Sequence, residues 1–291
     1  MQSSGETARA TPTTAATAVV WAPAPSGGAG LSGNAVRDAL DSRMGRYALG
    51  VFAHLLLLFI WYAGVKFGNV PKFVMPSPAD TIGALLQPNY SWWVNTAATA
   101  TEIFVGYGLA LLVGVVLALL FTWSKTFESL MLPLLITLNM IPKVALGPLI
   151  IVWLKYGIFP NSMMAFSIAV FPILLTTARG LRETEPELLD LVRSLRGSNW
   201  QLFTKIQLPG ALPYIFSGMK VGAVLAVAGA IVGEFLGSDK GLGYLMLQVQ
   251  VTLDTPAMFM AVIIITLLGV LLYGIVLLLE HIFVPRDARL A

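Results

Sequence analysis

Six long apolar stretches constrain the fold of this chain more than any other feature. A helix needs about 20 mostly apolar residues to cross the hydrocarbon core of a membrane. The sequence supplies that length at residues 47–65, 97–123, 130–153, 161–177, 215–236 and 258–279. Charged residues make up only 11% of the chain, against about 25% in soluble domains. The sequence therefore predicts an all-α membrane protein with six transmembrane helices.

The third stretch differs from the others because it contains Pro133, Pro142 and Pro148. Proline removes a helical hydrogen bond, and backbone groups freed inside a membrane must find other partners. We expect this span to be kinked or partly re-entrant.

The distribution of Lys and Arg predicts the orientation. Thirteen of the 18 basic residues fall on the side of the N-terminus and four on the other side, with Lys143 inside a span. Basic residues favour the cytoplasmic side, so we expect both termini in the cytoplasm of a bacterial inner (plasma) membrane. Residues 1–42 are rich in small and polar residues and predict a disordered cytoplasmic tail. Residues 43–291 then form the membrane domain.

A charged loop at residues 181–213 stands out in this apolar chain. Nine charged residues lie between Arg179 and Lys205, and the predicted orientation places them in the cytoplasm. Leu188, Val192 and Leu195 recur at helical spacing, which predicts a short amphipathic helix.

The end of this helix and the start of a second one are also predicted. Gly197 is expected to end the first helix in a left-handed conformation. Ser198 and Gln201 have the spacing of a capping box and should open a second short helix that runs through Lys205. The segment "LPGALP" at 208–213 is expected to stop it. Such a helix pair could lie in the lipid headgroups or dock a partner protein, and the residues themselves leave both open.

The loop resembles the EAA loop of the membrane subunits of ATP-binding-cassette importers. Asp190-Leu191-Val192 stands where that motif has Glu-Ala-Ala, and Ile206-Gln207-Leu208-Pro209 matches its end. Arg196 occupies the slot of the motif's glycine, and Gly197 follows it.

Further segments resemble the nitrate, sulfonate, taurine and bicarbonate branch of these permeases. They are "PSPAD" (76–80), "IPKVALGPLIIVWLKYG" (141–157), "FPILLTTARGL" (171–181), "GEFLGSDKGLGYL" (233–245) and "LDTP" (253–256). Within the branch, the similarity is greatest to permeases for riboflavin or thiamine-precursor pyrimidines.

The resemblance implies the fold of a type I importer permease that forms the pathway for a small organic solute. The expected solute is a vitamin or precursor such as riboflavin or hydroxymethylpyrimidine; a sulfonate, taurine or nitrate is the alternative. The implied partners are a dimer of ATP-binding subunits, an extracytoplasmic solute-binding protein, and a second permease copy or homologue. ATP hydrolysis would occur on the separate subunit, so this chain needs no catalytic residue, cofactor, metal or nucleic acid. The residues expected to couple to the ATPase are Glu187, Leu188, Asp190, Leu191, Val192, Arg193, Leu195, Arg196, Gly197, Ile206, Leu208 and Pro209.

The predicted substrate pathway comprises residues at the break in the third span and on the fifth span. They are Asn139, Pro142, Lys143, Gly229, Gly233 and Glu234. Lys143 follows a proline inside a span, as at the discontinuities that transporters use for binding or gating; snorkelling at a kink is the competing interpretation. Glu102 and Glu234 lie near the outer ends of spans and Lys220 near an inner end, so all three are expected to snorkel.

One face of the fifth span consists almost entirely of glycines, which have no side chains. Gly218, Gly222, Gly229, Gly233 and Gly237 fall within an arc of roughly 100°. Such faces let membrane helices pack closely, although part of the face could also line a cavity. The glycines of the following outer loop lack the spacing of a phosphate-binding loop and are expected to form turns.

Two other classes of protein fit the sequence less well. An ion-coupled secondary transporter would show inverted repeats and more paired charges inside the membrane. A membrane-embedded enzyme would need a catalytic set, but the chain has no cysteine and two histidines far apart in sequence.

Overall fold

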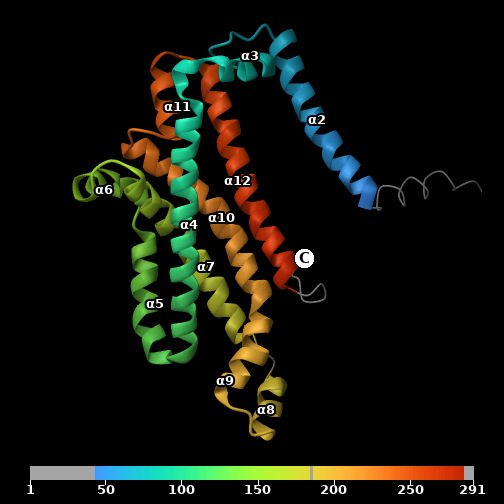
Figure 1. Ribbon diagram of the computed structural model, residues 1–291, viewed down its shortest axis with the longest axis vertical. Coiled ribbons are helices and arrows are strands. Elements are labelled where there is room, and N and C mark those ends of the chain that lie inside the picture. The colour runs from blue at the N-terminus through green and yellow to red at the C-terminus, as the bar shows by residue number, and fades with distance from the viewer. Residues whose placement is uncertain (1–42, 184–185, 285–291) are drawn as a thin grey trace, which may run out of the picture. The chain divides into compact units, whose positions relative to one another are not determined.

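The computed structural model describes residues 43–183 and 186–284, which form helices and short connections without any strand (Figure 1). The predicted disordered tail, residues 1–42, lies outside the described residues. The chain divides into two compact units, residues 1–57 and 58–291. The boundary falls inside the first described helix, α2 (Arg43–Phe67). Every contact described below lies within the second unit.

The second unit is built from long helices with short helices between them. α3 (Pro78–Gly83), η1 (Ala84–Leu86) and η2 (Pro88–Tyr90) lead into the long helix α4 (Trp92–Trp123). The remaining elements are α5 (Lys125–Met140), η3 (Lys143–Leu146), α6 (Gly147–Leu154), α7 (Ile158–Arg182), α8 (Pro186–Ser194), α9 (Asn199–Leu202), η4 (Phe203–Gln207), α10 (Leu208–Gly237), α11 (Leu242–Val251) and α12 (Thr255–Phe283).

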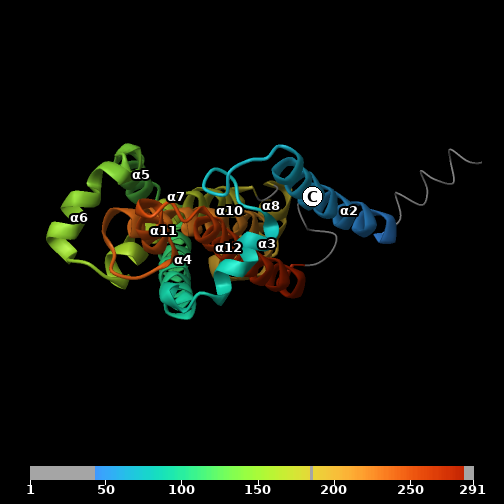
Figure 2. The same ribbon diagram turned by 90° about the horizontal axis from the view of Figure 1, so that it is seen from above.

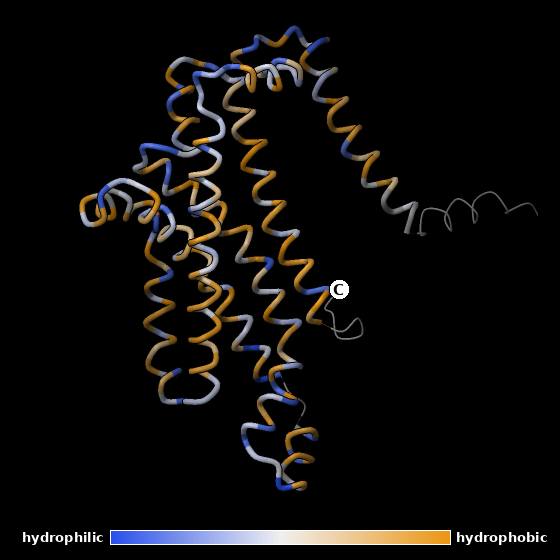
Figure 3. Tube along the Cα trace, viewed as in Figure 1, coloured by the Kyte–Doolittle hydropathy of each residue, from blue (hydrophilic) through white to orange (hydrophobic). Residues whose placement is uncertain are grey.

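Five helical segments of the described residues are long and apolar enough to span a membrane. They are Ala48–Phe67, Pro88–Trp123, Ile158–Arg182, Asn199–Gly237 and Thr255–Phe283. Four of them contain a predicted span, and Ala48–Phe67 covers all but the first residue of the predicted span 47–65, so five of the six are confirmed. The hydropathy colouring shows α5 and α12 as largely hydrophobic along their length (Figure 3).

The third predicted span is broken, as the expectation of a kinked or partly re-entrant span requires, and the structure does not confirm it as a sixth continuous spanning helix among the described residues. α5 ends at Met140, and Ile141 and Pro142 are extended before η3 and α6 begin. The residue before a proline avoids the helical conformation, and proline has no N–H to continue the ladder. Pro133 lies inside α5 without ending it, so Pro142 is the residue that breaks the span.

α7 forms the centre of the second unit because it packs against both α4 and α10. Glycines make this close approach possible: a Cβ added at Gly229 of α10 would lie 2.7 Å from Ala165 Cα. Gly106 of α4 approaches the same residue from the other side, where a Cβ would lie 2.5 Å from Ala165 Cβ. The packing interpretation of the glycine face is therefore confirmed at Gly229. Seen from above, α5 and α6 lie to one side of these helices (Figure 2).

The "PSPAD" segment forms the capped start of α3. The Asp80 backbone N–H donates to Ser77 Oγ (3.1 Å), and the Ser77 backbone N–H donates to Asp80 Oδ2 (3.4 Å), which is a capping box. Lys72 Nζ lies 2.7 Å from Asp80 Oδ1. The hydrogen bond from Lys72, with a further one from Ser77, holds the pKa of the Asp80 carboxyl below its usual range.

The "LDTP" segment begins α12. Asp254 is the N-cap and accepts the backbone N–H of Ala257 (3.2 Å), and the Tyr90 hydroxyl donates to the other carboxylate oxygen of Asp254. Thr255 Oγ1 donates to the Phe73 carbonyl at 2.6 Å. These bonds tie the segment before α4 to the start of α12.

Candidate functional site

α8 and α9 connect the end of α7 to the start of α10 and lie beyond the turn between α4 and α5 (Figure 1). The predicted apolar face of α8 has little cover from the described chain: Leu191 is 55% exposed and Leu195 is 74% exposed. Trp200, at the start of α9, is 66% exposed. Burial of a leucine side chain is worth about 1.5–3 kcal/mol. This end of the molecule therefore offers apolar surface to a partner or a membrane surface.

The end of α8 differs from the prediction in one residue. Arg196, not Gly197, is left-handed, with φ of 54°. The Gly197 N–H donates to the Val192 carbonyl (2.9 Å), which is the longer hydrogen bond of a Schellman motif with Arg196 at C′. Gly197 is required for a different reason, because a Cβ there would lie 2.5 Å from Val192 Cγ1. The position where the EAA motif has glycine is thus the left-handed position of this turn, and Arg196 occupies it in this chain.

The start of the second helix is confirmed, and its end is not. The Gln201 N–H donates to Ser198 Oγ (3.2 Å), and the Ser198 N–H donates to Gln201 Oε1 (2.9 Å), as a capping box requires. The "LPGALP" segment does not stop the helix. α9 continues through one π-helical segment, η4, into α10, and residues 199–237 form one helical stretch. Pro209 and Pro213 both lie within this stretch, and local π adjustments re-satisfy backbone groups that prolines free in membrane helices.

The other predicted coupling residues fall into two groups. Glu187, Asp190 and Pro209 are exposed, whereas Ile206 and Leu208 are half-buried. The side chain of Arg193 lies outside the described residues. Leu188 is 40% exposed and Val192 is half-buried against the turn.

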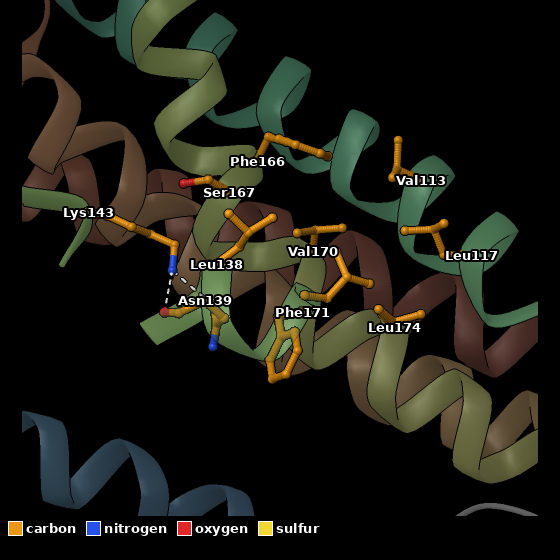
Figure 4. A pocket seen from close by; sticks show the side chains of 11 residues that line it. Val113, Leu117, Leu138, Asn139, Lys143, Phe166, Ser167, Val170, Phe171 and Leu174 are labelled. Atoms are coloured by element: carbon orange, nitrogen blue, oxygen red, sulfur yellow. Dashed lines mark hydrogen bonds between the residues drawn. The ribbon is translucent and has the colours of Figure 1, made fainter. Parts of the chain in front are cut away.

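Lys143 and Asn139 line a cavity of about 240 Å³ between α4, α5 and α7. The Lys143 ammonium donates to Asn139 Oδ1 (2.9 Å) and to the Asn139 carbonyl (3.2 Å) (Figure 4). Most of the remaining wall is apolar and includes Phe166 and Phe171, with Ser167 as a further polar side chain. The break at Pro142 therefore places one cation beside an apolar cavity.

The structure does not bring the six predicted pathway residues to one place. Only Asn139 and Lys143 lie on this cavity, and Pro142 at the break is exposed. Gly229 and Gly233 face α7, where a Cβ at Gly233 would lie 2.9 Å from Asn161 Cα. Glu234 lies in a separate polar cluster.

This polar cluster lies near the end of α10 that leads to α11. Glu102 and Glu234 are each 1% exposed, so the expectation that they snorkel to water is wrong. Glu234 accepts a hydrogen bond from Thr99 Oγ1 (2.5 Å), and Asn161 Nδ2 donates to Glu102 Oε1 (2.8 Å). Helix packing shields both carboxyl groups from water, Glu102 inside α4 and Glu234 near the end of α10.

The cluster also holds the first turn of α11. The N–H groups of Gly241 and Leu242 donate to Asn95 Oδ1 (2.9 Å) and Thr99 Oγ1 (2.8 Å), and those of Gly243 and Tyr244 donate to the Glu234 carboxylate. Residues of α4 and α10 thereby satisfy N–H groups that a helix start leaves without intrahelical partners. The loop glycines contact a carboxylate of their own chain: a Cβ at Gly243 would lie 2.8 Å from Glu234 Oε2.

Sequence reasoning missed this cluster, although a signal was present. Asn95, Thr99 and Glu102 are spaced i, i+4 and i+7, which places them on one face of α4. Polar residues at helical spacing in an apolar helix indicate a shared buried partner.

Lys220 is not merely a snorkelling side chain. Its ammonium pairs with Glu280 Oε2 of α12 at 2.8 Å, with side-chain exposures of 23% and 8%. Glu280 was not recognised as a candidate from the sequence. The two helices run in opposite directions (Figure 1), and the pair joins the middle of α10 to the end of α12.

The long apolar helices define a multi-pass membrane protein with exposed apolar surface at one end. The family model for the binding-protein-dependent transport system inner membrane component matches residues 110–285, and the chain belongs to this family. It is the permease subunit of an importer and a transport component, not an enzyme.

Curated relatives agree with this assignment over most of their length. A "Probable ABC transporter permease protein" of Haemophilus influenzae is 34% identical, covering 79% of this chain and 94% of the relative. The "Formylaminopyrimidine transport permease protein ThiX" of Halalkalibacterium halodurans is 31% identical, covering 79% and 92%. The "Riboflavin transport system permease protein RibX" of Chloroflexus aurantiacus is 35% identical, covering 83% and 91%.

Proposed function

We propose that this permease carries a small heteroaromatic vitamin or vitamin precursor, and that an ATP-binding subunit dimer drives it by docking on α8 and α9. The observation that carries the docking proposal is the exposed apolar surface of Leu191, Leu195 and Trp200 at the end of the molecule. An extracytoplasmic solute-binding protein would deliver the solute, and a second permease copy or homologue would complete the pathway. Both termini would lie in the cytoplasm.

The solute proposal rests on the relatives and on the cavity. Relatives named for formylaminopyrimidine and riboflavin transport are 31% and 35% identical to this chain, against 28% for a putative aliphatic sulfonates permease of Bacillus subtilis. The cavity at Lys143 holds one cation among apolar and aromatic side chains, which suits a flat ring with a carbonyl or anionic group. Its volume of about 240 Å³ favours a single pyrimidine ring over riboflavin.

Docking is tested with a Leu191→Arg substitution. We expect loss of ATPase co-purification and of uptake, because the charge replaces exposed apolar surface that the partner would bury. Asn199→Ala changes an exposed polar position of the same loop and should retain both activities. Normal co-purification and uptake by Leu191→Arg would overturn the docking proposal.

The solute is tested in vesicles that contain the permease with its ATP-binding subunit and its solute-binding protein. ATP-dependent uptake of riboflavin, hydroxymethylpyrimidine, taurine and nitrate is measured in parallel. Uptake of a pyrimidine or riboflavin is expected. Uptake restricted to taurine or nitrate would contradict the vitamin proposal and leave the docking proposal intact.

The role of Lys143 is tested in the same vesicles. Lys143→Ala should lower uptake while ATPase co-purification stays normal. Lys125→Ala, at the exposed start of α5, serves as the control. Unchanged uptake and selectivity in Lys143→Ala would make Lys143 a structural residue.

A further inference from the structure

Glu102 of α4 and Glu234 of α10 form a pair of buried carboxyl groups that the transport role does not explain. Each is 1% exposed. Thr99, about one turn before Glu102 on α4, donates to Glu234 Oε1 (2.5 Å), and Asn161, which donates to Glu102 Oε1, packs against Gly233 beside Glu234, so the two carboxyl groups share one polar cluster. Among the ion pairs of residues 43–183 and 186–284, none involves either group. Two adjacent buried negative charges without a cation would be very costly.

The hydrogen bonds around Glu234 are those of a carboxylate. Its oxygens accept the hydroxyl proton of Thr99 (2.5 Å) and the backbone N–H groups of Gly243 and Tyr244 (3.4 Å for Tyr244). The Thr99 oxygen itself accepts the Leu242 N–H (2.8 Å), so the Thr99 proton is free to point at Glu234. Several donors and the start of α11 favour the charged form of this side chain.

Glu102 differs from Glu234 because one of its two carboxyl oxygens has no hydrogen-bond donor among the described residues. Its Oε1 accepts from Asn161 Nδ2 (2.8 Å), whereas its Oε2 is buried without a hydrogen-bond partner among the described residues. Asn161 Nδ2 gives its second N–H to Ser238 Oγ (3.2 Å), so it has none left to donate. A proton on Oε2 would convert this orphaned acceptor into a donor, and the Glu234 carboxylate is an acceptor in the same cluster.

We propose that Glu102 and Glu234 bind one proton between them, with Glu102 as the neutral acid and its Oε2 hydroxyl donating to the Glu234 carboxylate. The ligand of this site is therefore a proton. The pair keeps a single negative charge, which lies against the start of α11 and fastens that helix to α4 and α10.

The remaining groups around the pair are consistent with this assignment. α7 contributes the neutral Asn161, and α11 contributes Tyr244 through its backbone. Asp239, in the connection from α10 to α11, acts on Glu102 electrostatically. Asp239 and its neighbour Lys240 are both exposed, so water screens them more than it screens the pair.

Infrared spectroscopy of the purified permease in lipid discs tests the proton directly. The wild type should show the carbonyl band of a protonated carboxyl group, and the band should shift in D₂O. It should disappear in Glu102→Gln and persist in Glu280→Gln, the control, because Glu280 is paired with a lysine. Absence of the band in the wild type, or its persistence in Glu102→Gln, would overturn the proposal.

Thermal unfolding of the same variants gives an independent readout. Glutamine at 102 supplies an N–H toward Glu234 and an oxygen toward Asn161, so the Tm should stay within about 2 °C of the wild type. Glutamine at 234 would set an amide donor against donors and should lower the Tm by at least about 4 °C. Equal losses in both variants, or failure of Glu102→Gln to fold, would contradict the assignment of the proton to Glu102.

Discussion

Replacing Arg196 with glycine should stabilise the end of α8. Arg196 is held at φ of 54°, and the left-handed conformation costs an L-residue about 1–2 kcal/mol relative to the right-handed one. Glycine avoids that cost but loses about 0.5–1 kcal/mol more chain entropy on folding. The net expectation is a gain of about 0.5–1 kcal/mol in the local stability of the turn.

Amide hydrogen exchange along α8 measures this gain, because it reports local opening equilibria. A gain of that size should slow exchange at Leu191 and Val192 about two- to fivefold in Arg196→Gly. Arg196→Ala is the control: it also removes the side chain but keeps the left-handed strain, so its exchange should match the wild type. Arg196→Asn should fall between them, because asparagine tolerates this conformation better than arginine does.

If the left-handed φ of residue 196 limits the stability of the turn, amide exchange must slow in the order alanine, asparagine, glycine. Equal exchange rates in the glycine and alanine variants would show that φ does not limit the stability of the turn. Slower exchange in both than in the wild type would show that the arginine side chain itself destabilises α8. Either result would refute the reasoning from the backbone.

Three further predictions concern packing, charge and pH. Gly106→Ala should destabilise the protein by about 1–3 kcal/mol through overpacking against α7, whereas Gly108→Ala, where an added Cβ meets nothing within 4 Å, should be neutral or stabilising; equal Tm values would contradict this. Lys220→Met should lower the Tm because it leaves the Glu280 carboxylate unpaired, and adding Glu280→Leu should recover much of the loss; a double variant no better than the single would argue against the ion pair. Because the pKa of Asp80 is lowered, its charged carboxylate stabilises α3 above about pH 4, and this stabilisation is lost as the pH falls through the folded-state pKa. Amide exchange in α3, corrected for intrinsic exchange, should therefore speed up between pH 5 and pH 3. Unchanged rates would exclude a stabilising role of the Asp80 carboxylate.

Local patterns predicted much of the structure. Five spans follow from length and hydropathy alone, and the capping box at Ser198 and Gln201 formed as its spacing required. The break of the third span follows from Pro142, because a proline and the residue before it restrict the backbone whatever surrounds them. These features depend on residues close in sequence.

The features that the sequence did not predict depend on distant residues or on competition between local preferences. Thr99 and Glu234 are 135 positions apart, and no local pattern states that they meet. Lys220 and Glu280 were separated in the same way. At "LPGALP", the proline preference for ending a helix competed with the need to satisfy backbone groups continuously, and the π-helical segment resolved that competition in favour of continuity.

The continuity of α9, η4 and α10 has a mechanical consequence. The helical stretch covers 39 residues, which corresponds to a rod of roughly 58 Å at 1.5 Å per residue. One end lies beside Trp200 and the other bears Glu234, and close glycine contacts hold the middle against α7. A sideways displacement of the end at Trp200 would therefore rotate this helical stretch about its contact with α7. The end at Glu234 would swing in the opposite direction, and any compliance would concentrate at the π-helical turn.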